Sequence, residues 1–232
     1  MELVITAALT VVAGAVDAIT FLTMGHLFAA LTTGNLLFLS FALVGEGQVP
    51  VARPAAALIA FACGAAATTW ASRQFDSRGR GWLSVALISE SVLLGAAGAL
   101  VLWRHGTGSL TNDPDLVAIA IVSFAMGMRA VTMLLFGVAE MPTLLAQMSM
   151  VKLIAELAGR PHVHRGTDAV GQRVARTPLA ATVGGLVLGG VAGTLMVPWG
   201  TGRALVVVGA VVLALSLAHL LMCRPLVSDG GT

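Results

Sequence analysis

Three ionisable residues lie inside apolar stretches of this chain, where charged side chains are rare. Asp17 is about fifteen residues into the first stretch, Glu90 eight into the fourth, and Arg129 about thirteen into the fifth. At 1.5 Å per helical residue, Asp17 and Arg129 lie roughly 20 Å from where their stretches begin. A lone charge in a bilayer costs at least ~2.5–3.5 kcal/mol, so it should face protein or water and be paired.

Asp17 and Arg129 have opposite charges, and we predict that they form a buried ion pair. Two interpretations stay open: the pair is part of a substrate or proton site, or it only fixes the register of two helices. In either case removing one partner leaves the other charge buried, which is strongly destabilising. For Glu90 the alternatives are a proton acceptor, a partner for Arg129, or a hydrogen-bonded structural carboxyl.

Polar residues also interrupt the second apolar stretch, at Thr32-Thr33-Gly34-Asn35. Gly allows a break, and Thr and Asn can satisfy freed backbone groups or bind a ligand. Packing of small residues between helices explains the same types equally well. A matching stretch from Pro142 to Gln147 favours an interrupted helix. The candidate substrate- or ion-binding residues are therefore Asp17, Thr33, Gly34, Asn35, Glu90, Arg129 and Gln147.

The amino-acid composition indicates that these residues lie in a lipid membrane and not in water. Apolar residues make up 57% of the 232 residues, and charged residues only 10%. A typical soluble domain is about 25% charged, so this chain cannot cover a water-facing surface, and it is too hydrophobic for disorder. Apolar runs of about 20 residues exclude a transmembrane barrel. We predict an all-α, polytopic helical membrane protein, with residues 1–232 forming a single integral membrane domain.

Eight apolar segments are separated by polar or Gly- and Pro-containing stretches. They span about Leu3–Met24, Leu27–Val44, Arg53–Trp70, Trp82–Trp103, Leu116–Phe136, Met141–Leu157, Thr177–Val197 and Ala204–Met222. Arg-rich loops follow the third and the sixth segments, and both loops are expected in the cytoplasm. Three full crossings between those loops would place them on opposite sides, so one segment does not cross. The sixth, which is the least apolar, is the best candidate.

A shift of 112 residues aligns the end of the first segment with the end of the fifth, so that Asp17 falls on Arg129 and Asn35 on Gln147. We predict an inverted repeat of two halves, about 1–105 and 114–224, because each half then has three crossings. The model has six crossings, two interrupted or non-crossing segments, and both termini in the cytoplasm. A seven-crossing model, in which the second segment spans, is the rival.

The cysteines, histidines, net charge and glycines of the chain do not indicate a further catalytic or binding site. Cys63 and Cys223 have no partner at disulfide or zinc spacing, and His162 and His164 lack further ligands, so we expect no metal and no cofactor. No basic region or cleavage site marks a removable signal peptide. The small positive charge does not indicate nucleic-acid binding. Five glycines of the seventh segment indicate tight helix packing, namely Gly184, Gly185, Gly189, Gly190 and Gly193.

The chain resembles a known family at two motifs. The run from Gly14 to Leu22, followed by Gly25 and by Thr33-Gly34-Asn35, is similar to the opening of the YoaK-like small bacterial inner-membrane proteins. The run from Ala125 to Arg129 resembles the second motif of that family. The resemblance covers essentially the whole chain. It implies a multi-pass protein of the bacterial inner membrane and supports the importance of Asp17, Gly34, Asn35 and Arg129. It implies no particular activity.

The sequence bears on three classes of function. A secondary transporter or permease for a small solute, with protons as a possible coupling ion through Asp17 or Glu90, accords with the repeat, the interrupted segments and the deep charges. A membrane enzyme is disfavoured, because no nucleophile–base pair, metal set or phosphate loop is visible. A non-catalytic scaffold or partner subunit, in which an oligomer is possible, is the alternative. We expect transport; the sequence does not name the solute.

Overall fold

The chain is an all-α membrane protein, as the composition predicts. The computed structural model describes residues 2–46, 50–74, 80–106, 115–136 and 169–222, and these contain α-helices, one short 3₁₀ helix and no strand. The elements are α1 (Glu2–Thr23), α2 (Thr32–Val44), α3 (Ala52–Gln74), α4 (Arg80–Gly106), α5 (Leu116–Phe136), α7 (Ala169–Met196), η2 (Val197–Trp199) and α8 (Thr201–Met222). Among the described residues, six helices are long and apolar enough to cross a membrane: α1, α3, α4, α5, α7 and α8.

These six helices correspond to the six segments predicted to cross. The predicted bounds of α5 match the observed ones, and α1 differs by one residue at each end. The second segment was predicted to begin at Leu27, which is wrong, because α2 begins only at Thr32. Its thirteen residues reach about 20 Å, less than the ~30 Å of a bilayer core. The sixth segment lies outside the described residues.

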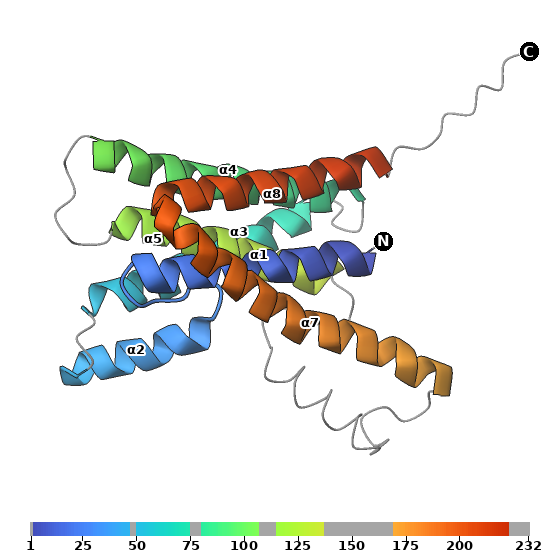
Figure 1. Cartoon of the computed structure of the whole chain (residues 1–232), viewed down its shortest axis with the longest axis horizontal. Helices are drawn as coiled ribbons and strands as arrows, with labels where there is room; N and C mark the ends of the chain where they lie inside the picture. Colours follow the sequence, from blue (N-terminus) through green and yellow to red (C-terminus); the bar gives the residue numbers. More distant parts are fainter. Residues whose placement is uncertain (1, 47–49, 75–79, 107–114, 137–168, 223–232) are drawn as a thin grey trace, which may run out of the picture.

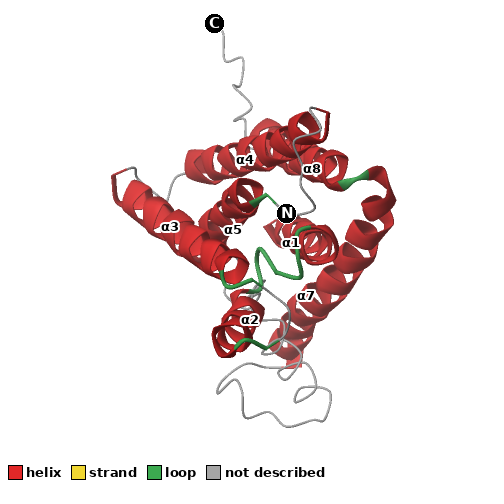
Figure 2. Cartoon of the chain, turned by 90° about the vertical axis from the view of Figure 1, so that its left-hand side faces the viewer, coloured by secondary structure: helices red, strands yellow, loops and turns green. Residues whose placement is uncertain are grey.

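The helices form two central members and a surrounding layer. Viewed end-on, α1 and α5 lie in the middle, α4 and α8 along one side, and α2 on the opposite side (Figure 2). The outer helix α7 packs on α1, and the outer helix α3 packs on α5. Neighbours α4 and α8 also pack on each other. Along the long axis, α1 and α5 run in opposite directions (Figure 1).

The surface of this bundle is apolar, the reverse of a soluble protein. Large side chains such as Leu134, Leu195 and Trp70 are exposed, while many buried positions hold Ala, Thr or Ser. Lipid tails are as apolar as leucine, so burying leucine does not drive helix association in a bilayer; close packing of small residues does. The distribution of side chains is therefore the one expected of a helical membrane protein.

Glycines bring the helix pairs into backbone contact. A Cβ at Gly189 of α7 would collide with the Val11 carbonyl of α1, and one at Gly127 of α5 would collide with the Phe61 carbonyl of α3. The prediction of tight packing by the glycines of the seventh segment is confirmed for Gly185, Gly189 and Gly193, which face α1. A Cβ at Gly184 or Gly190 would meet nothing within 4 Å, although the Gly190 backbone itself lies close to Gly14 of α1.

Antiparallel helices α4 and α8 combine close approach with hydrogen bonds. A Cβ at Gly98 would lie 2.7 Å from the Gly202 carbonyl oxygen, so the backbones almost touch there. About two turns further along, the Ser91 hydroxyl donates to the Gly209 carbonyl at 2.8 Å. Near the other end, Ser84 Oγ and His219 Nδ1 are hydrogen-bonded at 3.0 Å. This interface is therefore fixed at three levels.

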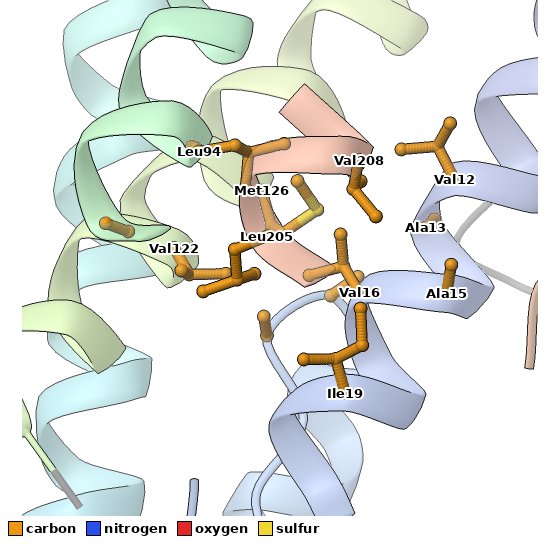
Figure 3. Close-up of a cluster of buried hydrophobic side chains, with 14 of the residues drawn as sticks. Val12, Ala13, Ala15, Val16, Ile19, Leu94, Val122, Met126, Leu205 and Val208 are labelled. Carbon is orange, nitrogen blue, oxygen red and sulfur yellow. The ribbon is translucent and has the colours of Figure 1, made fainter. Parts of the chain in front are cut away.

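The apolar core lies where α1, α4, α5 and α8 meet (Figure 3). Fully or almost fully buried side chains from all four helices interdigitate there: Val12, Val16, Ile19, Leu94, Val122, Met126, Leu205 and Val208. Met126 precedes Arg129 by one helical turn, and Val16 precedes Asp17 by one residue. Arg129 and Asp17 therefore lie beside this apolar core.

Candidate functional site

After α1 the chain turns back into the bundle. Gly25 has φ +95° and His26 has φ +59°, both in the left-handed region that favours glycine. The N–H groups of Met24 and His26 donate to the carbonyls of Thr20 and Phe21, at 2.9 and 3.2 Å, and so end α1. Residues 27–31 then run alongside α1 before α2 begins, and Leu27, Ala29 and Ala30 are buried. We call residues 24–31 the re-entrant segment.

Asp17 holds the far end of the re-entrant segment. Its Oδ1 accepts a hydrogen bond from the N–H of Ala30 at 2.7 Å, across thirteen residues of sequence. The side chain is only 4% exposed. Non-helical backbone in a membrane protein has unpaired N–H and C=O groups, and it persists only where protein or water satisfies them. Asp17 satisfies the Ala30 N–H directly, and the N–H groups of Ala29 and Leu31 also interact with its carboxylate.

Asn35 satisfies two more. Its Oδ1 accepts from the Phe28 N–H at 2.9 Å, and its Nδ2 donates to the Phe28 carbonyl. An amide side chain has one acceptor and one donor side, so it pairs with a peptide unit as a neighbouring strand would. Asn35 lies in the first turn of α2 and therefore ties the start of that helix to the segment before it.

Aromatic packing completes this region. The Phe28 ring stacks on Phe21 of α1, with centroids 4.9 Å apart, and on Phe38 of α2 at 6.0 Å. A Cβ at Gly34 would lie 2.6 Å from the Phe28 ring, so only glycine allows this position of the ring. The expected break within Thr32–Asn35 is thus corrected. The break precedes Thr32, and these four residues begin α2 and hold the broken backbone.

Arg129 and Glu90 form a second buried cluster, nearer the opposite end of the bundle. Arg129 Nη2 donates to Glu90 Oε1 in a salt bridge, and Nη1 donates to the Leu9 carbonyl at 2.9 Å. The side chains of Arg129 and Glu90 are each 2% exposed. One guanidinium therefore links α5 to α4 and to α1. Of the three interpretations of Glu90, the partner of Arg129 is the one that the structure has.

The predicted ion pair between Asp17 and Arg129 is wrong. Among the described residues, Arg129 has Glu90 as its salt-bridge partner and Asp17 has none. Asp17 is six residues before the end of α1, and Arg129 is seven before the end of α5, or about 9 and 10 Å. Because α1 and α5 are antiparallel, those distances are measured from opposite ends of the bundle (Figure 1). Asp17 and Arg129 therefore lie at different depths in the bundle, although they occupy similar positions along their own helices.

Three buried polar atoms near these clusters have no hydrogen-bond partner among the described residues: Asp17 Oδ2, Arg129 Nε and Ser123 Oγ. Buried polar groups are nearly always hydrogen-bonded, so each such atom calls for an explanation. Burying Asp17 Oδ2 costs the most free energy, because the Asp17 carboxylate has no salt bridge among the described residues. Arg129 acts on Asp17 through space but does not contact it.

The other predicted site residues do not join the two buried clusters among the described residues. Thr33 is exposed in the first turn of α2. Gln147, with His162 and His164, lies outside the described residues. In residues 2–46, 50–74, 80–106, 115–136 and 169–222, no group of three or more His, Cys, Asp or Glu side chains is placed to hold a metal ion. The backbone partners at Leu9, Phe28 and Ala30 were missed, because backbone groups leave no signal in residue type.

Comparison with known proteins gives a family but no activity. Residues 5–218 match the model of a family described as "Protein of unknown function (DUF1275)". The chain is also 28% identical, over 153 residues, to the UPF0700 transmembrane protein YoaK of Bacillus subtilis (strain 168). That alignment covers 66% of this chain and 65% of the relative's length, just under two thirds of it. No solved structure matches the chain significantly. The predicted resemblance is therefore confirmed.

Proposed function

We propose that this chain, a multi-pass helical membrane protein that belongs to the DUF1275 family, is a secondary transporter or permease for a small solute. The proposal rests on the geometry of the chain itself. We place it in the bacterial inner membrane. The observation that carries the proposal is Asp17, a buried carboxylate with one free oxygen, set against non-helical backbone inside the bundle. No catalytic step is part of the proposal.

The arrangement of helices supports an inverted repeat. If α1 corresponds to α5 and α3 to α7, the contact between α1 and α7 has its counterpart in the contact between α5 and α3. The remaining pair, α4 and α8, would correspond to each other, and they pack together (Figure 2). Inverted repeats are common in transporters, where the site lies between the two halves. Asp17 and Arg129 belong to the two central helices.

The re-entrant segment supports the same function. In transporters, discontinuous helices near mid-membrane carry substrate and ion sites, because their free backbone groups bind ligands. Here the broken backbone of residues 24–31 is held by only a few side chains, chiefly Asp17 and Asn35. A ligand that competed for Asp17 would act directly on the position of this segment.

A second candidate function rests on a different observation. The polar atoms of Asn35 and most of those of Arg129 are satisfied within the protein, by Phe28, Glu90 and Leu9. Fully paired polar groups are what a non-catalytic membrane scaffold or partner subunit would contain. We favour transport because Asp17 is not fully paired.

Comparison of metabolites inside and outside cells tests the proposal. Cells are prepared with wild-type protein, without it, with Asp17→Asn, or with Thr194→Ala, and immunoblots of membranes verify equal protein amounts. We expect at least one small solute whose inside-to-outside ratio depends on the wild-type protein. Asp17→Asn should resemble cells without the protein, and Thr194→Ala, at an exposed position of α7, should resemble wild type. Identical metabolite ratios in all four strains would refute transport and favour the scaffold.

A further inference from the structure

Among the residues that the structure describes, the charges buried at the centre of the bundle do not balance. Asp17 and Glu90 contribute two carboxylates, while Arg129 contributes one guanidinium. Arg129 is engaged by Glu90, so the surplus negative charge belongs to Asp17. An unpaired carboxylate in a low-dielectric interior is costly, and it is neutralised by a counter-ion or a proton.

Asp17 has room in its hydrogen bonding for one further partner. Oδ1 accepts from the Ala30 N–H, the N–H groups of Ala29 and Leu31 also stabilise the carboxylate, and Oδ2 is buried without a hydrogen bond of its own among the described residues. An alkali cation needs several oxygen ligands, whereas a proton needs one free carboxylate oxygen. The single free oxygen therefore fits a proton.

We propose that Asp17 Oδ2 is the site of the coupling proton of this transporter, and that binding of the proton releases the re-entrant segment. The inference rests on the proposed function and specifies its coupling ion. A proton from the aqueous side bonds to Oδ2 and converts the carboxylate into a neutral acid. No other bond is made or broken by that step.

Release follows because both oxygens belong to one group. While Asp17 is charged, the Ala30 N–H donates to a carboxylate, and such charge-assisted bonds are roughly twice as strong as neutral ones. After protonation, Oδ1 is a weaker, carbonyl-like acceptor, so residues 27–31 are held mainly by Asn35 and by the stacking of Phe28. The position of the re-entrant segment thus depends on the proton.

The other charged groups around Asp17 do not replace this partner. Arg129 and Glu90, from α5 and α4, neutralise each other, and His26 on the segment itself is exposed and packs edge-on against Phe21. The Arg53 side chain of α3 lies against Gly25, near the start of the segment. Among side chains whose surroundings the structure describes, α7 carries no ionisable residue, and α8 carries only Arg203, which is exposed, and His219, which bonds to Ser84.

Thiol labelling of the purified full-length chain in lipid nanodiscs tests the proposal without any solute. Cys63 and Cys223 are replaced by Ser, and Ala29→Cys, at a position 1% exposed, reports opening of the segment. Its labelling rate is divided by that of Glu46→Cys, an exposed position after α2, because this ratio cancels the pH dependence of the thiol itself. Leu31→Cys is a second reporter for the case that Ala29→Cys disturbs folding.

We expect this ratio to rise roughly tenfold on acidification, which is the difference between a charge-assisted and a neutral hydrogen bond. With Asp17→Asn, which resembles the neutral acid, the ratio should be high at every pH. Asp115→Asn, at the start of α5, is the matched control and should behave as wild type. A ratio independent of pH in wild type, or one that still rises with Asp17→Asn, would overturn the proposal. A response to Na⁺ at fixed pH would overturn it in favour of an alkali cation.

The labelling result and the metabolite result are independent. Flat labelling together with solute ratios that depend on the protein would leave transport in place and remove the proton from Asp17. Labelling that depends on pH, with identical solute ratios in all strains, would leave the proton site and remove transport.

Discussion

The salt bridge between Glu90 and Arg129 gives the sharpest test of how this bundle is held together. Arg129→Gln removes the guanidinium that pairs with Glu90 and leaves the Glu90 carboxylate buried without its partner. Breaking a buried pair from one side costs about 3–5 kcal/mol. Glu90→Gln should cost less, about 2–3 kcal/mol, since Arg129 keeps its bond to the Leu9 carbonyl and the long-range attraction of Asp17.

The double variant separates a true pair from two independent effects. With Glu90→Gln and Arg129→Gln combined, no uncompensated charge remains in the pair, and two amides can bond to each other. The loss of stability should therefore be smaller than the sum of the two single losses, by about 2 kcal/mol or more. The free energy of unfolding of each variant is measured in the same bilayer-like medium, for example by steric trapping in bicelles.

An ion pair at the edge of the bundle is the matched control. Arg104 Nη1 lies 2.9 Å from Asp115 Oδ2, but the Arg104 side chain is 35% exposed. Arg104→Gln should cost about 1 kcal/mol or less, as exposed pairs do. The reasoning is refuted if the Glu90 and Arg129 losses add within 0.5 kcal/mol, or if Glu90→Gln costs more than Arg129→Gln.

Three further predictions concern packing, the re-entrant segment and topology. Gly189→Ala should destabilise by about 1–3 kcal/mol, because its Cβ would collide with α1. Gly190→Ala, whose Cβ would meet nothing within 4 Å, should be nearly neutral, and thermal unfolding compares the two variants. Asn35→Ala should cost about 2–4 kcal/mol in the free energy of unfolding, since it leaves both backbone groups of Phe28 unpaired. A tag at the N-terminus and a thiol at Glu46→Cys should react from opposite sides of the membrane, as reagents that do not cross it would show.

Each of these has a clear contrary result. Equal losses for the two glycines would mean that α1 and α7 are not in backbone contact. For Asn35, the control is Thr33→Ala on the exposed face of α2; a loss as large at Thr33 would show that α2, and not the segment before it, is being weakened. Reaction of the N-terminal tag and of Glu46→Cys from the same side would favour the seven-crossing model.

Most helix positions were well predicted from the sequence, because crossing a bilayer requires about twenty apolar residues and the chain marks their ends with polar or Gly- and Pro-containing stretches. Leu116–Phe136 is the clearest case. The exception among the long helices is α7, which begins at Ala169 and not at the predicted Thr177. The start of α2 was missed because Leu27 to Leu31 are as apolar as a helix. What breaks the helix there is Gly25 and its left-handed backbone, together with side chains from elsewhere that satisfy the unpaired backbone.

The residues of the site were predicted, but their partners were not. Asp17, Asn35, Glu90 and Arg129 stand out because charged and amide groups are expensive in lipid. Which of them meet depends on depth and helix direction, and the shift of 112 residues pairs positions that the antiparallel helices place at different levels. Sequence position alone could not distinguish Glu90 from Asp17 as the partner of Arg129.

The glycine contacts divide the bundle mechanically. Where backbones touch, at Gly189 against α1 and at Gly127 against α3, two helices form one stiff unit, because no side chain there can change rotamer to absorb a shift. Contact between the stiff units is made by side chains such as Val16 and Met126, which can repack (Figure 3). If the bundle changes shape, α1 should travel with α7, α5 should travel with α3, and the sliding surface should run between Asp17 and Arg129.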